Sequence, residues 1–252
     1  MSTVRFNKKD GMGTITLNDP DKMNGLSEPL VTKLLKILDA AEKDRDIKVI
    51  ILTGQGKIFS AGGDISIFDR GISGGFDYIN FVLKAFVAIE KVKKPVIAAV
   101  NGYALGGGTE LTLSSDIVIA SDKAVFGLPE VGIGIMPGYA VLRLHEVVGR
   151  TRAKELILTG RQFDAAEAEK IGIVNQIVPH DDLMGAVEKK AKLLMERAPM
   201  SLTLSKMTVN RSIGGDDLNA AINATSLLFG YEDIKEGQRS FFEKRKPNFQ
   251  GK

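Results

Sequence analysis

The stretch that decides the fold is found at residues 95–113 and reads PVIAAVNGYALGGGTELTL. Pro95 to Val100 is short and continuously apolar, which predicts a buried β-strand. The glycines between Gly102 and Gly108 predict a tight turn, and the segment from Thr109 to Leu113 predicts the start of a helix. A strand that leads through a turn directly into a helix is typical of an α/β core.

The same succession is repeated along the chain. Further short strands are predicted at Gly13 to Leu17, Ile47 to Thr53, Asp116 to Ala120 and Val125 to Gly127. Ser27 can cap a helix that carries its leucines on one face and ends near Asp44. Short strands that are each followed by a helix predict a largely parallel sheet.

The second half of the chain is mainly helical. Before it, the glycine-rich segment Asp69 to Phe76 is predicted to be a flexible loop, and a helix from Asp77 to Glu90 follows. Helices are then predicted at 139–148, 152–158, 165–170, 181–197, 199–212, 218–229 and 233–244. We therefore expect residues 1–195 to form an α/β core that holds the functional site, and residues 196–252 to form a helical C-terminal region.

Composition excludes several classes of site. The chain has 252 residues, 44% of them hydrophobic and 26% charged, as in an ordinary globular protein. It has no cysteine, which excludes disulfides, thiolate nucleophiles and cysteine-based metal sites. Its two histidines, His145 and His180, are far apart and lack the spacing of a zinc-binding motif, so we expect no metal.

Charge and hydropathy argue against nucleic acid and membrane partners. The formal charge is only +3, and lysine and arginine are dispersed, whereas nucleic acid binding as a main role would predict a clustered basic excess. Apolar runs such as Pro95 to Val100 are too short to span a bilayer. Met1 to Asp10 resembles neither a signal peptide nor a transit peptide. We therefore expect a cytoplasmic protein that acts on a small molecule.

Two glutamates and two glycine turns carry the predicted chemistry. Glu110 follows the first glycine turn, Glu130 follows Pro129, and a second glycine turn lies at Phe59 to Asp64. A pair of carboxyl groups supplies an acid and a base, and backbone N–H groups at glycine turns can stabilise an oxyanion. The combination predicts an enzyme that acts next to a carbonyl group.

Each feature also has a simpler interpretation. Glycines after a strand occur in dinucleotide-binding folds, but the spacing here differs from G-x-G-x-x-G, and a purely structural turn is the other alternative. Asp64 can simply cap a helix, and a single glutamate is more often a solvated surface acid. For Glu110, burial would raise the carboxyl pKa and a helix N-terminus would lower it, and the sequence leaves open which effect is larger.

Three motifs in order resemble a known family. They are FSAGGD at 59–64, NGYALGGGTE at 101–110 and FGLPEVG at 126–132. They look like the pattern of the enoyl-CoA hydratase/isomerase (crotonase) superfamily, and the chain is most similar to an enoyl-CoA hydratase. The resemblance extends from about Val4 to Gln250. It implies a spiral of ββα units with a helical C-terminal region that makes a homotrimer or a dimer of trimers.

The resemblance also implies a reaction. The backbone N–H groups of Gly63 and Gly107 would hold the thioester oxygen of an acyl-CoA from fatty acid metabolism. Glu110 would position and deprotonate the water that adds at Cβ, and Glu130 would supply the proton to Cα. Because both glutamates are present, the resemblance favours reversible hydration of a trans-2-enoyl-CoA to a 3-hydroxyacyl-CoA, with no cofactor beyond the coenzyme A of the substrate.

Ligand contacts follow from the same resemblance. The positions that match coenzyme A contacts are Met23, Lys57, Ala61, Ile65, Phe241 and Lys244. Those expected near the acyl group are Phe68, Phe81 and Tyr139. For the lysines, a solvated surface charge is the alternative.

Tyr139 marks a departure from the family. Relatives usually continue Pro-Gly with more glycines, and comparison with that pattern predicts a loop one residue shorter here. Tyr139 either reshapes the pocket for a cyclic or branched acyl group or packs in the core. A Δ3,Δ2-enoyl-CoA isomerase, a hydratase of a cyclic dienoyl-CoA, and a binding protein on the same scaffold, for example for RNA, remain the alternative functions.

Overall fold

A computed structural model describes residues 3–64, 71–210, 232–233, 236, 243–245 and 247–252. Its strands are β1 (Val4–Lys9), β2 (Met12–Leu17), β3 (Val49–Gly54), β4 (Ile58–Ser60), β5 (Val96–Val100), β6 (Tyr103–Leu105), β7 (Ile117–Ser121), β8 (Val125–Gly127), β9 (Gln162–Asp164) and β10 (Gln176–Val178). Its α-helices are α1 (Glu28–Lys43), α2 (Gly71–Lys91), α3 (Gly107–Leu113), α4 (Ala140–Val148), α5 (Arg150–Thr159), α6 (Ala165–Lys170), α7 (Leu183–Met195) and α8 (Pro199–Val209). Short 3-10 helices occur at Pro20–Lys22 (η1), Pro129–Ile133 (η3) and His180–Asp182 (η4).

The strands form two sheets. The larger sheet has the order β1-β2-β3-β5-β7-β10 and is parallel except for the β1–β2 pair. The smaller sheet has the order β4-β6-β8-β9 and is parallel except for the β8–β9 pair. The largely parallel pairing that the sequence predicts is therefore confirmed.

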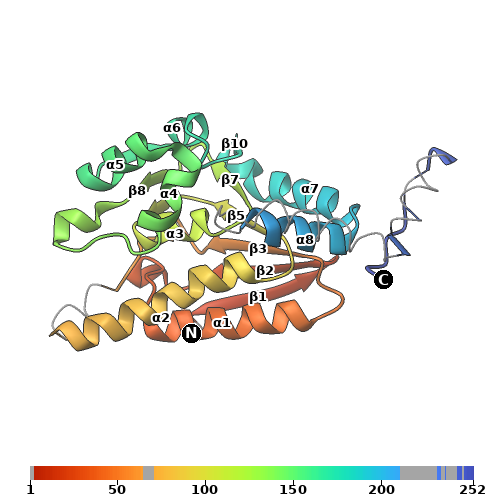
Figure 1. The fold of residues 1–252 in the computed structure, drawn as a ribbon, viewed down its shortest axis with the longest axis horizontal. Coiled ribbons are helices and arrows are strands. Elements are labelled where there is room, and N and C mark those ends of the chain that lie inside the picture. The colour runs from red at the N-terminus through yellow and green to blue at the C-terminus, as the bar shows by residue number, and fades with distance from the viewer. Residues whose placement is uncertain (1–2, 65–70, 211–231, 234–235, 237–242, 246) are drawn as a thin grey trace.

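Successive strand pairs are divided between the two sheets. In β3–β4, β5–β6 and β7–β8, the first strand joins the larger sheet and the second joins the smaller one, and a helix follows each pair. This repetition is the predicted spiral of ββα units, which runs from orange to green in Figure 1. It brings the ends of β4, β6 and β8 next to one another, although they are far apart in sequence.

The central strands of the larger sheet, such as β3 and β5, are buried on both faces. Along β3, Ile50 and Leu52 belong to the main core, whereas Val49 and Ile51 face a second cluster, because successive side chains of a strand point to opposite faces. Helix α7 covers the second cluster with Leu183, Val187 and Ala191. Helices α1 and α2 lie side by side on the other side (Figure 1), and the buried face of α1 repeats at helical spacing.

Two local predictions are wrong. Gly71 to Phe76 were expected in a loop but form the first turns of α2, whose apolar face continues as far as Ile89. The three glycines there were taken as loop residues, yet packing of the rest of the helix outweighs their low helix propensity. Tyr103–Leu105 were expected within a tight turn but form β6, because they pair with β4 and β8. A three-residue strand has too little sequence pattern to be recognised alone.

The C-terminal region is described only in part. Helix α8 ends at Val209, where a continuation to Ser212 was predicted, and residues 211–212 lie outside the described part. The helix predicted at 218–229 lies outside the described residues, as does most of the one predicted at 233–244. The backbone of Gly251 lies against Pro199, so the chain returns to the start of α8 (Figure 1). The division of the chain at residue 195 stays a prediction.

Candidate functional site

A cavity of about 630 Å³ is lined by residues of α2, α3 and η3, by the turn after β4 and by the segment that leads into α4. Its lining brings together five of the residues predicted to act in the site: Ala61, Gly63, Gly107, Glu110 and Glu130. Apolar side chains such as Leu26, Val82 and Ile135 make up much of the remaining wall. Such a cavity, mostly apolar with a few converging polar groups, is typical of a small-molecule site.

The two predicted glycine turns are in direct contact. Gly62 has φ +92°, and a Cβ at this position would lie 2.7 Å from the backbone nitrogen of Gly107. A side chain here would therefore separate the turns. The Gly62 carbonyl in turn accepts a hydrogen bond from the backbone N–H of Leu26.

This contact leaves two backbone donors at the cavity wall. Within the described residues, the N–H groups of Gly63 and Gly107 donate no hydrogen bond to the protein. Gly107 is the first residue of α3, where the N–H groups have no partner within the helix. A polarised carbonyl oxygen is the kind of acceptor that two such donors can share.

Glu110 is held by the N-terminus of a different helix. It lies in the short, buried α3, and its side chain is 5% exposed. Its Oε1 accepts hydrogen bonds from the backbone N–H groups of Tyr139 (2.7 Å) and Ala140 (2.8 Å), which begin α4. These bonds fix one oxygen of the carboxylate and leave Oε2 for another partner.

The pKa of Glu110 reflects two opposed effects. Burial raises the pKa above its usual value, and the two backbone hydrogen bonds partly offset this by stabilising the ionised form. Burial is the larger effect, which answers the question that the sequence left open. The helix N-terminus that matters is that of α4, which is thirty positions further along the chain.

Glu130 differs from Glu110 in its surroundings. It lies in η3, is 8% exposed, and its Oε2 is a buried atom with no hydrogen-bond partner in the described structure. Burial, and to a smaller extent the nearby Glu110 carboxylate, raise the pKa of Glu130 to about 7. At neutral pH Glu130 is thus partly protonated, which suits a proton donor.

Of the other predicted site residues, those that the structure describes do not line this cavity. Met23 is exposed, and its carbonyl accepts a hydrogen bond from the N–H of Ala61, so its backbone holds the glycine turn at Phe59 to Asp64. Lys57 and Lys244 are exposed. Phe81 packs against the main core and is not part of the cavity lining. Ile65, Phe68 and Phe241 lie outside the described residues.

Tyr139 packs in the core, which is the second of the two alternatives that the sequence left open for it. It is buried, its ring packs against Phe86 with 5.2 Å between ring centroids, and its hydroxyl donates a hydrogen bond to Glu90. Its side chain is not among those that line the cavity. Its contribution to the site is the backbone N–H that holds Glu110.

Among the cavity-lining residues that sequence reasoning missed is Tyr78, which carries a polar group. The Tyr78 hydroxyl donates to the carbonyl of Leu26 (2.9 Å) and accepts from the N–H of Asp64 (2.6 Å), so it ties α2 to the turn that contains Gly63. Tyr78 lies on the face of α2 that also carries Val82 and Phe86, and nothing in that apolar pattern marks a functional hydroxyl.

The described residues contain no cluster of three or more His, Cys, Asp or Glu that could hold a metal ion. Among the helices described, none combines the length and the hydrophobicity that a membrane span requires.

Comparison with known proteins gives matches over nearly the whole chain. Residues 7–252 match a family described as Enoyl-CoA hydratase/isomerase. A probable mitochondrial enoyl-CoA hydratase of Dictyostelium discoideum is 38% identical over 254 residues, which cover 99% of this chain and 91% of that protein. The short-chain-enoyl-CoA hydratase of Clostridium acetobutylicum is also 38% identical, over 98% of this chain and 97% of that protein. The crystal structure of an enoyl-CoA hydratase from Bacillus anthracis gives a TM-score of 0.93 at 32% identity, covering 99% of this chain and 100% of that one.

Proposed function

The chain belongs to the enoyl-CoA hydratase/isomerase family, and we propose that it is an enoyl-CoA hydratase that adds water reversibly to a trans-2-enoyl-CoA. Full-length relatives named as enoyl-CoA hydratases bear out the predicted hydro-lyase activity. The observation that carries the proposal is the meeting, in one cavity, of two buried glutamates and two backbone N–H groups without a partner in the described chain.

The N–H groups of Gly63 and Gly107 act as the oxyanion hole. The thioester oxygen of the substrate accepts a hydrogen bond from each. As water adds to the double bond, the thioester becomes enolate-like and negative charge grows on this oxygen. Fixed donors therefore stabilise the transition state more than the bound substrate, and a single such donor contributes about 3 kcal/mol.

The two glutamates divide the proton transfers. The ionised Glu110, with Oε1 fixed by the start of α4, orients a water molecule through Oε2 and takes its proton while the water oxygen bonds to Cβ. The protonated Glu130 delivers a proton to Cα. The product is a 3-hydroxyacyl-CoA, and a proton passes from Glu110 to Glu130 before the next turnover. In the reverse direction each residue exchanges its role.

The remaining parts of the ligand follow the family pattern. Met23, Lys57, Ala61 and Ile65 are proposed to contact coenzyme A, and Phe241 and Lys244 to reach the coenzyme A of a neighbouring subunit. The position of Ala61 at the rim of the cavity supports this assignment. The reaction needs no cofactor other than the coenzyme A that the substrate carries. The cytoplasmic location stays a prediction, since one relative is named as mitochondrial.

Hydration of crotonyl-CoA tests the proposal. The expected result is loss of the absorbance of the conjugated thioester, with a 3-hydroxyacyl-CoA as product. The variants Glu110→Gln and Glu130→Gln are each expected to lower kcat by about a hundredfold or more, because each removes a positioned acid or base. Near-normal turnover in both variants would contradict the mechanism.

A panel of substrates separates the alternatives within the family. Incubation with a 3-enoyl-CoA would produce a gain in conjugated absorbance if the protein were an isomerase. Cyclic and linear enoyl-CoA substrates, assayed in parallel for water addition, identify the acyl group. No turnover with any thioester, together with salt-sensitive RNA binding, would favour the binding-protein alternative.

A further inference from the structure

The carboxylate of Glu90 accepts hydrogen bonds from two residues at the start of α4. Oε2 of Glu90 accepts a hydrogen bond from the hydroxyl of Tyr139 at 2.9 Å, and Oε1 accepts one from the guanidinium of Arg143 at 2.7 Å. Tyr139 and Arg143 are four positions apart and thus lie one above the other on a helix. Glu90 is only 12% exposed, so this contact is shielded from water.

The same helix turn holds the predicted catalytic base. The backbone N–H groups of Tyr139 and Ala140 donate to Oε1 of Glu110. Tyr139 therefore contacts Glu90 through its side chain and Glu110 through its backbone. Any movement of this turn changes the two hydrogen bonds that orient the Glu110 carboxylate and stabilise its charge.

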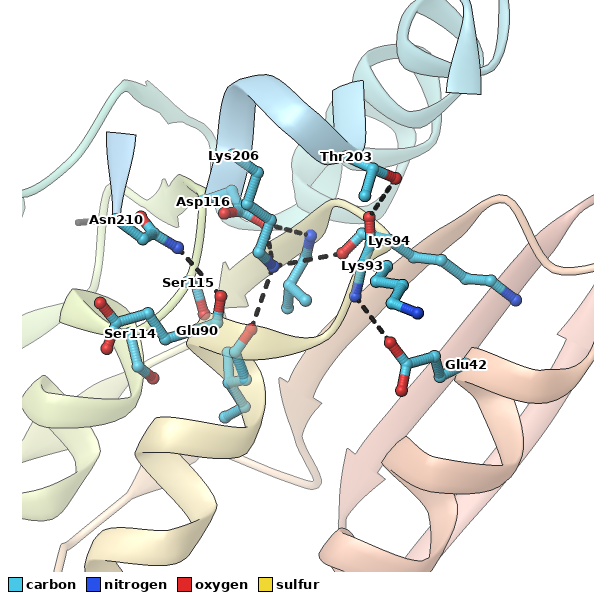
Figure 2. Close-up of polar contacts among 12 residues, drawn as sticks. Glu42, Glu90, Lys93, Lys94, Ser114, Ser115, Asp116, Thr203, Lys206 and Asn210 are labelled. Carbon is cyan, nitrogen blue, oxygen red and sulfur yellow. Dashed lines mark hydrogen bonds and ion pairs between the residues drawn. The ribbon is translucent and has the colours of Figure 1, made fainter. Parts of the chain in front are cut away.

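Glu90 is itself fixed at the end of α2. Its carbonyl accepts a hydrogen bond from the side-chain amide of Asn210 (2.9 Å), and the carbonyl of Ile89 accepts one from the ammonium of Lys206 (3.0 Å). Figure 2 shows Lys206 and Asn210 above the last turn of α2, with Asp116 beside the ammonium group. These two hydrogen bonds hold the end of α2, from which the carboxylate of Glu90 contacts α4.

From this arrangement we infer that Glu90 is a positioning residue for Glu110: by binding Tyr139 and Arg143 it fixes the start of α4, whose N–H groups orient the catalytic carboxylate. The inference rests on the proposed function for its kinetic consequence. Glu90 does not line the cavity and is not a catalytic residue in this scheme.

The protonation state of Tyr139 agrees with the direction of its hydrogen bond to Glu90. Burial and the neighbouring Glu90 carboxylate raise the pKa of Tyr139, so its hydroxyl keeps its proton and remains the donor. The charged groups that face Glu90 are Arg143 directly, and Asp116 and Lys206 at longer range. The charged neighbour of Glu110 is Glu130, whose carboxyl group belongs to the same cavity.

The test uses two conservative variants and a matched control. Tyr139→Phe removes the hydroxyl but keeps the ring contact with Phe86, and Glu90→Gln removes the charge but keeps the side-chain shape. The control is Glu146→Gln, because Glu146 is the other carboxylate on Arg143 but is 45% exposed and makes no hydrogen bond to Tyr139 within the described structure. Circular dichroism verifies that each variant is folded.

Kinetics with crotonyl-CoA give the first measurement. Tyr139→Phe and Glu90→Gln are each expected to lower kcat by about tenfold with KM within about twofold, because a misplaced base slows chemistry more than binding. The acidic limb of kcat against pH is expected to move to higher pH, since weaker N–H bonds raise the pKa of Glu110. The kcat of the double variant should be little lower than that of either single variant, because both changes break the same hydrogen bond between Tyr139 and Glu90. Glu146→Gln should match the wild type.

A second measurement does not depend on turnover. In protein labelled with carboxyl-¹³C glutamate, the Glu110 signal is assigned by its loss in Glu110→Gln, and its titration midpoint is expected to rise in both variants. A lower kcat with an unchanged Glu110 titration would overturn the inference and leave Glu90 a purely structural residue. If the wild type hydrates no enoyl-CoA, the proposed function fails, but the titration still decides whether Glu90 controls Glu110.

Discussion

Gly106 allows the carboxylate of Glu130 to lie close to the glycine turn that precedes α3. It has φ +53°, and a Cβ at this position would lie 2.5 Å from Oε1 of Glu130. Both the backbone conformation and the lack of space therefore require glycine. The residue contributes no functional group, yet it lets Glu130 reach the cavity.

Gly106→Ala is expected to displace the Glu130 carboxylate and lower kcat by about tenfold or more, because a shift of the proton donor by a fraction of an ångström weakens proton transfer. Steady-state hydration of crotonyl-CoA measures the effect. Gly132→Ala is the matched control, since a Cβ there meets nothing within 4 Å. Equal activity of the two variants would contradict the proposed role of Gly106.

The raised pKa of Glu130 also predicts how stability changes with pH. The pKa is about 7 in the folded protein and near 4.5 when the chain is unfolded. Between these values the folded state binds more protons, so its stability falls as pH rises. Relative to the Glu130→Gln variant, the wild type is expected to lose about 3 kcal/mol of unfolding free energy between pH 4.5 and pH 7.

Urea unfolding of both proteins at several pH values measures this difference. The glutamine variant has no charge to bury and is expected to become the more stable protein at neutral pH while losing activity. Parallel pH profiles for the two proteins would show that Glu130 titrates normally, and would remove the basis for its role as acid.

At the scale of elements, α8 is attached to the core through a buried cation. The ammonium of Lys206 binds the carbonyls of Ile89 and Lys94 and forms an ion pair with Asp116 at 2.7 Å, where the side chains are 6% and 19% exposed (Figure 2). Asp116 also accepts a hydrogen bond from the backbone N–H of Val96. This cluster joins the end of α2 to the starts of β5 and β7.

Lys206→Met is expected to destabilise the protein by about 3 kcal/mol, because it leaves the largely buried Asp116 carboxylate without its cation. Lys43→Met is the control. Lys43 pairs with Asp39 at the same 2.7 Å, but both side chains are mostly exposed, so solvent screens the interaction and little change is expected. Thermal and urea unfolding midpoints of both variants test the comparison, and similar values would contradict it.

At the scale of the whole molecule, the open prediction is the number of chains that assemble. Large apolar side chains are exposed on α4, α5, α8 and the segment before α4: Leu142, Leu158, Val209 and Met136. Exposed apolar side chains of this size are common at protein interfaces when they gather into a patch. The homotrimer or dimer of trimers stays a prediction, and these side chains are candidates for its interface.

Sedimentation equilibrium is expected to give a mass of three or six chains of 27.2 kDa. The mass should persist on dilution if the interface is apolar and extensive. A monomer at micromolar concentration would contradict the prediction, and would also remove the proposed contact of Phe241 and Lys244 with a neighbouring subunit.

Prediction from sequence succeeded where the pattern is local and long. The apolar runs of β3, β5 and β7 and the helical spacing of α1 and α7 are confirmed within a few residues. The start of α2 was wrong, because tertiary packing overrides the low helix propensity of Gly71 and its neighbours. The strands β1, β4, β6, β9 and β10 were not predicted, and most of these are only three residues long.

The sequence by itself determined the α/β class, the family, and the pair of glutamates with their glycine turns, because each of these is recorded in residue types at short spacing. Only the tertiary structure decided that the turns of Gly62 and Gly107 are in contact, that α4 supplies the donors to Glu110, and that Tyr139 turns toward Glu90. These contacts join segments 29 to 49 positions apart, and such contacts depend on how the sheets and helices pack together.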